Sequence, residues 1–217
     1  MRNILELDNT IVESIENIKY STDKDFEYWK KNPYPTITGL DIDWKNLIAN
    51  PPPNRSEQTK AELHKVQLMS SNLTAEEVKL VHEVDKDPGL LFVSTLQEKN
   101  LPYPKEEIEA YWSVIYPVVM NLKWLHNRPR PYELDKNLKH FKMKSMETAS
   151  YPSGHSVQGI LIAKVLGDKH PKAKSAFVKT GENISYSRRV ARAHYKSDSK
   201  VGEELGNSMY KHIKNKI

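Results

Sequence analysis

Apolar residues recur at steps of three and four along most of the chain from Ser56 onward, the spacing of one face of an α-helix. The alternation of apolar and polar residues that marks a half-buried strand is almost absent. The sequence therefore predicts an all-α fold, with a single-domain helical bundle over residues 56–217. This helical spacing is clearest in two runs of apolar residues. The first is Leu63, Val66, Met69 and Leu73, and the second is Ile108, Trp112, Ile115, Val119 and Leu122.

Local signals set the limits of the expected helices. Thr74 and Glu77 have the spacing of a capping box, which predicts a helix opening there. Pro88 and Pro104 each stand where a helix can begin, because the first turn does not use the missing N–H group. The remaining expectations are helices at 153–166, 171–193 and 200–214, and a polar loop at 131–149.

Two glycines, Gly202 and Gly206, stand four residues apart in the last expected helix. Residues at this spacing share one helix face. The pair therefore predicts that a neighbouring helix approaches closely there.

Residues 1–55 differ from the rest of the chain. They contain Asn32-Pro-Tyr-Pro, Gly39 and the run Pro51-Pro-Pro, and they show one plausible helix, near 8–19. Proline and glycine residues such as these interrupt helices and strands. We expect an irregular N-terminal extension packed on the domain formed by residues 56–217.

Composition narrows the class of protein. The first residues do not form a secretory signal, and the longest apolar stretch, Tyr111–Leu122, has about 12 residues against the roughly 20 that cross a bilayer. We therefore expect a cytoplasmic, soluble protein without a membrane partner.

The net charge is +5, but the lysines are spread along the chain rather than gathered in a stripe. This pattern favours an anionic substrate over nucleic acid.

Three clusters in the second half carry residues suited to phosphate chemistry. In the first, Lys123 and Arg130 are seven residues apart, two helical turns, so both can project from one side of a helix end. An ammonium and a forked guanidinium together suit an anion with several oxygens. Alone, this spacing is more typical of a solvated helix face.

The second cluster is Tyr151-Pro-Ser-Gly-His155. Ser153 and Gly154 at a helix start leave backbone N–H groups for an anion, and His155 follows within reach of a leaving-group oxygen. An ordinary capped helix with a surface histidine would have the same sequence.

The third cluster contains Arg188, His194 and Asp198. Because Arg188 and His194 lie on different faces of a continuous helix, they can meet one ligand only if the helix ends or bends between them. Asp198 can accept a hydrogen bond from His194 Nδ1 and leave Nε2 bare as a nucleophile. A structural His–Asp pair at a helix junction is the alternative.

In chain order the clusters read Lys-x6-Arg-Pro, Pro-Ser-Gly-His and Ser-Arg-x5-His-x3-Asp. This ordered set resembles the signature of the type 2 phosphatidic acid phosphatase superfamily, which includes the vanadium-dependent haloperoxidases. Within it, the chain is most similar to the bacterial class A non-specific acid phosphatases. That similarity rests on Arg128 two residues before Arg130, on the run from Ser150 to His155, and on Gly202 after Asp198.

The resemblance implies a role for each matching residue. A histidine attacks phosphorus and forms a phosphohistidine, an aspartate orients it, and a second histidine protonates the leaving group. The catalytic residues so implied are His194, Asp198 and His155, and the phosphate-binding residues are Lys123, Arg130, Ser153, Gly154 and Arg188. Arg128 and His126 are candidate substrate contacts: Arg128 belongs to the resemblance, whereas His126 lies inside the first cluster at a position that the family pattern does not specify.

The expected function is a soluble, metal-independent phosphatase that hydrolyses small phosphate monoesters. No side chains have the spacing of metal ligands, so no metal or other cofactor is expected, although phosphate or vanadate can occupy the site. Two alternatives stay open: a vanadate-dependent haloperoxidase, which is usually a longer chain, and a non-enzymatic anion-binding module. The expected partner is a small phosphorylated substrate, and apolar helix faces leave a homodimer open.

Overall fold

A computed structural model describes residues 43–69 and 71–215 of the chain. All regular structure within these ranges is helical, which confirms the all-α prediction. The helix expected near 8–19 lies outside the described residues. In chain order the elements are η2 (Trp44–Asn46), α3 (Glu57–Met69), α4 (Ala75–Lys86), α5 (Gly89–Gln97), α6 (Lys105–His126), α7 (Pro131–Leu134), η3 (Lys144–Met146), α8 (Gly154–Lys169), η4 (Pro171–Ala173), α9 (Lys174–Val190) and α10 (Lys196–Ile213).

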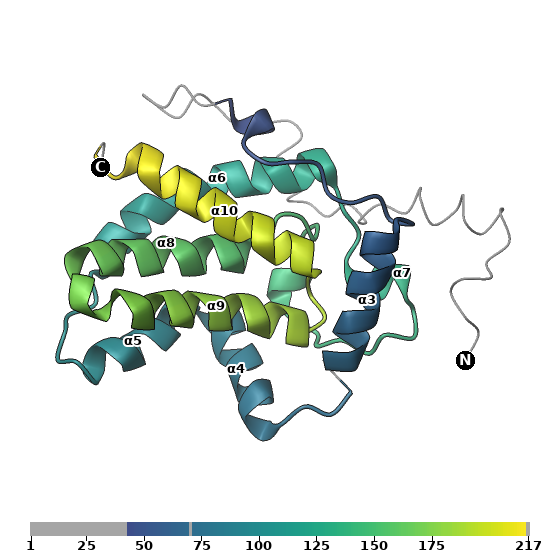
Figure 1. Ribbon diagram of the computed structural model, residues 1–217, viewed down its shortest axis with the longest axis horizontal. Helices are drawn as coiled ribbons and strands as arrows, with labels where there is room; N and C mark the ends of the chain where they lie inside the picture. Colours follow the sequence, from purple (N-terminus) through teal and green to yellow (C-terminus); the bar gives the residue numbers. More distant parts are fainter. Residues whose placement is uncertain (1–42, 70, 216–217) are drawn as a thin grey trace, which may run out of the picture.

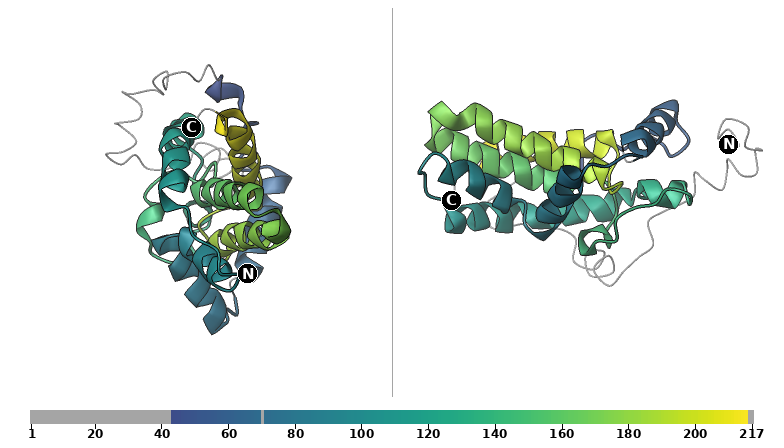
Figure 2. Two further views of the ribbon diagram at one scale, coloured as in Figure 1. Left: turned by 90° about the vertical axis from the view of Figure 1, so that its left-hand side faces the viewer. Right: turned by 90° about the horizontal axis from the view of Figure 1, so that it is seen from below.

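Helix α8 is the centre of the bundle (Figures 1 and 2). Helices α9 and α10 pack along it, α6 runs past another side, and α4 and α5 lie against α9. The sequence of α8 explains its position, because it presents apolar or small residues on every face and can be buried all round. Its core residues are Val157, Leu161, Ile162, Val165 and Leu166, which cluster with Ile115 and Leu122 of α6, Phe177 and Ile184 of α9, and Leu205 and Met209 of α10.

The two glycines of α10 hold that helix close to α8. A Cβ atom added to Gly202 would lie 2.6 Å from the carbonyl oxygen of Ser153, and one added to Gly206 would lie 2.6 Å from that of Val157. Both distances are shorter than a Cβ atom can tolerate against backbone. The predicted close helix approach is confirmed, and it fixes the start of α8 against the first turns of α10.

The helix starts expected at Thr74, Pro88 and Pro104 are confirmed. Thr74 caps α4 with a full capping box, in which its Oγ1 accepts from the Glu77 N–H at 3.1 Å and Glu77 Oε2 accepts from the Thr74 N–H at 3.0 Å. Helices α5 and α6 begin directly after the two prolines.

Three expectations differ from the structure. The segment 131–149 is not all loop, since it contains α7 and η3. Helix α3 ends at Met69, so Leu73 continues the apolar spacing without belonging to the helix. Helix α10 begins at Lys196 rather than 200, because the Asp198 carboxylate caps its N-terminus and the polar first turn shows no apolar spacing.

The described part of the N-terminal segment lies against the bundle. Leu47 and Ile48 pack on the main core, and the Tyr151 hydroxyl donates to the carbonyl of Ala49 at 2.6 Å. Helix α3 buries Leu63 and Val66 in a separate cluster.

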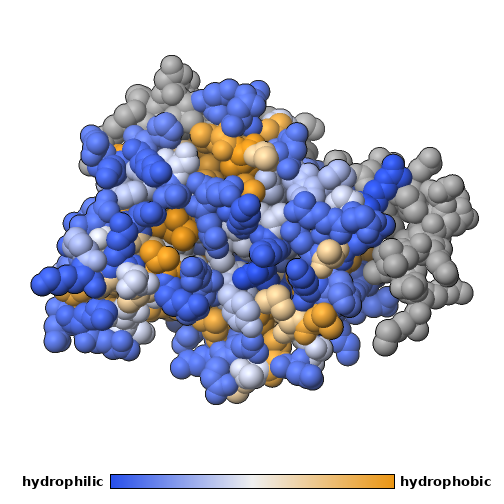
Figure 3. Space-filling view, in the orientation of Figure 1, coloured by the Kyte–Doolittle hydropathy of each residue, from blue (hydrophilic) through white to orange (hydrophobic). Residues whose placement is uncertain are grey.

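Hydrophilic side chains cover most of the face in Figure 3, with small hydrophobic patches between them. Within the described part of the chain, every helix is too short or too polar to cross a membrane.

Candidate active site

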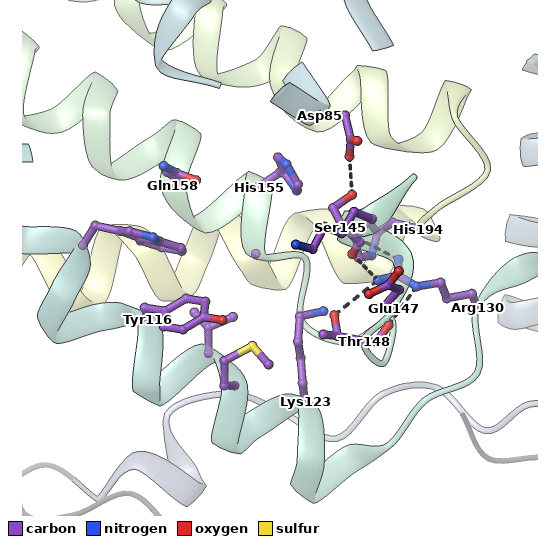
Figure 4. A pocket seen from close by; sticks show the side chains of 15 residues that line it. Asp85, Tyr116, Lys123, Arg130, Ser145, Glu147, Thr148, His155, Gln158 and His194 are labelled. Carbon is purple, nitrogen blue, oxygen red and sulfur yellow. Dashed lines mark hydrogen bonds between the residues drawn. The ribbon is translucent and has the colours of Figure 1, made fainter. Parts of the chain in front are cut away.

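A cavity of about 360 Å³ opens between α6, the start of α8, the end of α4 and the segment 144–148 (Figure 4). It contains residues from all three sequence clusters, so the fold brings them together. The lining residues are Asp85, Trp112, Tyr116, Val119, Met120, Lys123, Arg130, Lys144, Ser145, Glu147, Thr148, Gly154, His155, Gln158 and His194.

Lys123 and Arg130 converge by a turn rather than by sharing a helix. Helix α6 ends at His126, and Asn127 adopts the left-handed conformation (φ 42°) that terminates it. Arg130 then occupies the N-cap position of α7. The expectation that both side chains project from one helix end is therefore wrong in its geometry, although both line the cavity.

Both cations are buried and anchored by backbone oxygens. Lys123 Nζ donates to the carbonyl of Ala149. Arg130 donates from Nε to the carbonyl of Thr148 at 2.8 Å and from Nη1 to that of Ala193 at 2.7 Å. Burial, followed by the Arg130 charge, lowers the pKa of Lys123 well below its usual value. An oxyanion would relieve this unfavourable crowding of cations.

His194 lies in the short connection between α9 and α10. Helix α9 ends at Val190, and Arg192 has a positive φ of 59° within the turn. The structure thus contains the helix end that the spacing of Arg188 and His194 required.

The His194 ring is held between an acidic and a basic side chain. Its Nδ1 lies 3.3 Å from Asp198 Oδ2, and its Nε2 lies 3.3 Å from Arg130 Nη1. A hydrogen bond donated by Nδ1 to the carboxylate leaves Nε2 unprotonated on the cation-lined side of the cavity. Burial is the main reason that the pKa of His194 is lowered well below 6.5, and this effect exceeds the opposing effect of Asp198.

Asp198 is completely buried, yet it remains ionised. Burial alone would raise its pKa, but the Arg128 guanidinium and the hydrogen bonds from His194 and Ser150 lower the pKa to about 2. Oδ2 accepts from the Ser150 hydroxyl at 2.5 Å and from the Tyr195 N–H at 3.0 Å. The carboxylate is therefore fixed from several directions.

His155 occupies the second position of α8 and lines the opposite wall (Figure 4). Burial lowers its pKa well below 6.5, and the charges of Arg188, Lys123 and Arg130 lower it further. In the absence of an anion, this histidine is neutral at pH 7.

The Ser-Gly pair contributes less to the cavity than the motif suggested. The Ser153 N–H donates to the Asp198 carbonyl at 3.1 Å, and its Oγ accepts from the Ser156 hydroxyl at 2.9 Å. Ser153 is thus the N-cap of α8, joined to α10, and does not line the cavity. Gly154 does line it.

Arg188 stands behind the cavity wall. Its guanidinium donates to Ser145 Oγ at 2.7 Å and lies 3.4 Å from Asp85 Oδ1. Burial lowers its pKa to about 10, so it stays charged at neutral pH. Through Ser145, whose hydroxyl also donates to Asp85, Arg188 is one contact away from the cavity.

The two candidate substrate contacts do not line the cavity. Arg128 is buried, with Nη1 2.6 Å from Asp198 Oδ1 and its guanidinium carbon 4.0 Å from the Tyr195 ring centre. His126 packs edge-on against Tyr151. These positions correct the expectation for both residues.

Sequence reasoning missed several residues that shape the site. Asp85, Ser145 and Thr148 line the cavity, while Ser150 and Glu62 support Asp198 and its neighbour Ser197. Of these, only Ser150 belongs to a motif of the sequence. The others come from segments without a recognisable pattern, and only the fold places them here.

Within the described residues, no group of three or more histidine or carboxylate side chains could hold a metal ion. No family model matches the chain.

Comparisons with known proteins give one sequence relative and two structural neighbours. The chain is 35% identical over 60 residues to a non-specific acid phosphatase of Salmonella typhimurium (strain LT2), a match covering 28% of this chain and 24% of that protein. It is similar in structure to the first bacterial vanadium-dependent iodoperoxidase (TM-score 0.63, 18% identity), over 82% of this chain and 55% of that one. It is also similar to a transmembrane PAP2-type phosphatidylglycerolphosphate phosphatase from Bacillus subtilis (TM-score 0.51, 16% identity), over 72% of this chain and 84% of that one.

The chain thus has the all-α fold of the type 2 phosphatidic acid phosphatase and vanadium haloperoxidase superfamily. Its match to the acid phosphatase spans about a quarter of that protein, and its match to the iodoperoxidase about half.

Proposed function

We propose that the chain is a metal-independent phosphatase that hydrolyses small phosphate monoesters through a phosphohistidine at His194. The observation that carries the proposal is the pairing of His194 Nδ1 with Asp198 at 3.3 Å, while Nε2 stands beside Arg130 at the cavity wall. This arrangement provides a neutral imidazole with its lone pair next to a cationic side chain, as attack on an anionic phosphorus centre requires.

The first step forms a bond between His194 Nε2 and phosphorus while the ester bond breaks. The electron pair of that bond goes to the leaving oxygen, which takes a proton from His155. Lys123 and Arg130 stabilise the charge on the phosphoryl oxygens, and Asp198 stabilises the positive charge on the imidazole ring. In the second step water attacks phosphorus and gives a proton to His155, while the bond between phosphorus and Nε2 breaks, its electron pair returns to His194 and inorganic phosphate leaves.

His155 must be protonated for the first step, although its pKa is lowered in the free site. A bound phosphate ester brings up to two negative charges among the cations responsible for part of that shift. Opposite charge nearby favours the protonated imidazole. We therefore infer that substrate binding itself raises the pKa of His155 and prepares the general acid.

The test is hydrolysis of an aryl phosphate in the presence of EDTA, with orthovanadate as inhibitor. The proposal requires turnover that survives EDTA, is inhibited by vanadate, and is lost in His194→Ala. A matched variant, His64→Ala, changes an exposed histidine of α3 and should retain activity.

A vanadate-dependent haloperoxidase is the second candidate, and the iodoperoxidase neighbour is the observation that favours it. The cavity fits vanadate, since His194 Nε2 could bind it while Lys123 and Arg130 hold its oxygens. Bound vanadate would supply peroxide activation. Iodide oxidation that requires both vanadate and peroxide, without phosphatase turnover, would favour this candidate over the phosphatase.

A further inference from the structure

The cavity has two chemically different ends, and the mechanism uses only one. The phosphate end contains Lys123, Arg130, His155 and His194. The other end is formed by one face of α6, with Gln158 of α8 opposite (Figure 4). The residues that α6 contributes are Trp112, Tyr116, Val119 and Met120.

These four side chains share a face because they stand at positions i, i+4, i+7 and i+8 along the helix, the spacing of one side of an α-helix. Tyr116 is 41% exposed, a large aromatic ring left accessible at the cavity. Its ring centre lies 5.7 Å from that of Trp112, with the planes tilted by 55°. The wall therefore offers two adjacent aromatic rings rather than a surface of aliphatic side chains alone.

The position of this wall matches the path of a leaving group. Gln158 follows His155 by three residues, about 4.5 Å along α8, and Tyr116 precedes Lys123 by seven, about 10 Å along α6. An ester oxygen beside His155 would direct the rest of the molecule between Gln158 and Tyr116. The residues on this path are uncharged, in contrast to those at the phosphate end.

On the basis of the proposed function, we propose that this wall is a leaving-group subsite that selects monoesters carrying an aromatic ring. A planar ring can stack on Tyr116 and Trp112 in the offset or edge-on arrangements that aromatic pairs prefer. The Gln158 amide can donate to or accept from a polar substituent on that ring. Aryl-alkyl and nucleoside phosphates are the chemical classes that meet this description.

The test compares three esters whose leaving groups are all simple primary alcohols: ethyl, 2-cyclohexylethyl and 2-phenylethyl phosphate. Leaving-group acidity then contributes little to the differences. We expect kcat/KM for the phenylethyl ester to exceed that of the ethyl ester by about tenfold or more, from burial of the ring. The cyclohexylethyl ester should gain less, since it cannot make aromatic contacts.

Substitutions on α6 test whether Tyr116 causes the preference for the phenylethyl ester. Tyr116→Ala should lower the phenylethyl-to-ethyl ratio of kcat/KM severalfold. Tyr116→Phe, which keeps the aromatic ring, should retain the wild-type ratio. Leu125→Ala is the matched control, because Leu125 is also 41% exposed on α6 but lies outside the cavity. This control should leave the ratio unchanged.

Binding of 2-phenylethylphosphonate and ethylphosphonate, measured by calorimetry, separates the subsite from the chemistry. Tighter binding of the phenyl compound with no turnover of any ester would contradict the proposed function but support the subsite. Equal kcat/KM for the three esters would overturn the subsite and leave the phosphatase standing. Equal gains for the phenyl and cyclohexyl esters would overturn the aromatic selectivity.

Discussion

Arg128 and Asp198 form a buried ion pair, with Nη1 2.6 Å from Oδ1, on the carboxylate oxygen that His194 does not use. The guanidinium is only 1% exposed and the carboxylate is fully buried. One carboxylate therefore connects two residues of different roles, since Oδ2 orients the ring of His194 while Oδ1 is held by Arg128.

The same guanidinium reaches back to helix α3. Its Nη2 donates to Thr59 Oγ1 at 3.1 Å and lies 3.9 Å from Glu62 Oε2. Glu62 in turn accepts from the Ser197 hydroxyl at 2.6 Å. Helix α3 thus supports the Asp198 carboxylate from behind, although it does not contribute to the cavity lining.

Arg128→Met should therefore impair both folding and turnover. Removing one partner of a buried pair leaves an uncompensated carboxylate, which costs about 3–5 kcal/mol of unfolding free energy. We expect kcat to fall roughly 100-fold as the His194 ring loses its fixed orientation. Inhibition by inorganic phosphate should change less, because Arg128 does not line the cavity.

Urea unfolding and steady-state kinetics measure these effects. Arg189→Met is the control, since Arg189 stands on α9 over the Tyr186 ring and outside the Asp198 network. Wild-type kcat in the Arg128→Met variant would contradict the positioning role of the ion pair.

Gly206→Ala should destabilise the protein by about 1–3 kcal/mol, the usual cost of forcing extra atoms into a packed contact. The added methyl meets the backbone carbonyl of Val157 at 2.6 Å, and backbone cannot rotate away. Gly167→Ala on α8 is the contrasting variant. Its methyl group meets a side-chain atom, Cγ of Lys174 at 3.1 Å, instead of backbone.

Chemical denaturation of both variants checks this contrast. Alanine is favoured over glycine in a helix interior by about 1 kcal/mol, so Gly167→Ala should be neutral or slightly stabilising. Equal destabilisation of the two variants would show that the close contact of α8 and α10 is not the cause.

The pH profile of kcat/KM should peak on the acid side of 6.5. The pKa values of His194 and His155 are both lowered, chiefly by burial. A lowered pKa means that the neutral form persists to lower pH. His194 therefore stays nucleophilic in mild acid, and His155 loses its proton as the pH rises, which lowers the rate above the optimum.

Comparison of the wild type with His155→Asn isolates the fall in rate that is caused by loss of the His155 proton. The substrate titrates equally in both proteins, so a difference in the alkaline limb reports His155. With a poor leaving group, the variant should lose most activity; with 2,4-dinitrophenyl phosphate, which departs without a proton, it should lose far less. An optimum above pH 7.5 in the wild type would contradict this account.

The sequence predicted the fold class and most helix starts because these depend on local signals. The apolar spacing of α6, the capping box at Thr74 and the paired glycines of α10 each act within a few residues. The start of α10 was missed because a carboxylate cap, rather than an apolar residue, defines it.

The contacts of the site are also of two kinds, those set by local spacing and those made between distant segments. The pairing of His194 with Asp198 follows from a four-residue spacing across a helix start, which sequence alone can indicate. The inward position of Arg128 and the contact of Asp85 with Arg188 join residues 70 and 103 apart in the chain. Only the packing of distant segments determines such contacts, so no short motif could have predicted them.

The most direct test of the central claim is trapping of the phosphohistidine. His155→Asn mixed with 2,4-dinitrophenyl phosphate should form the intermediate readily, because the leaving group needs no acid, and should hydrolyse it slowly, because water lacks its base. Rapid quenching in alkali followed by mass spectrometry should then find one phosphoryl group on His194, labile to acid and absent from the double variant that also carries His194→Ala. Burst-free turnover with no acid-labile phosphoprotein, or a phosphoryl group on another residue, would contradict the assignment of His194 as the nucleophile.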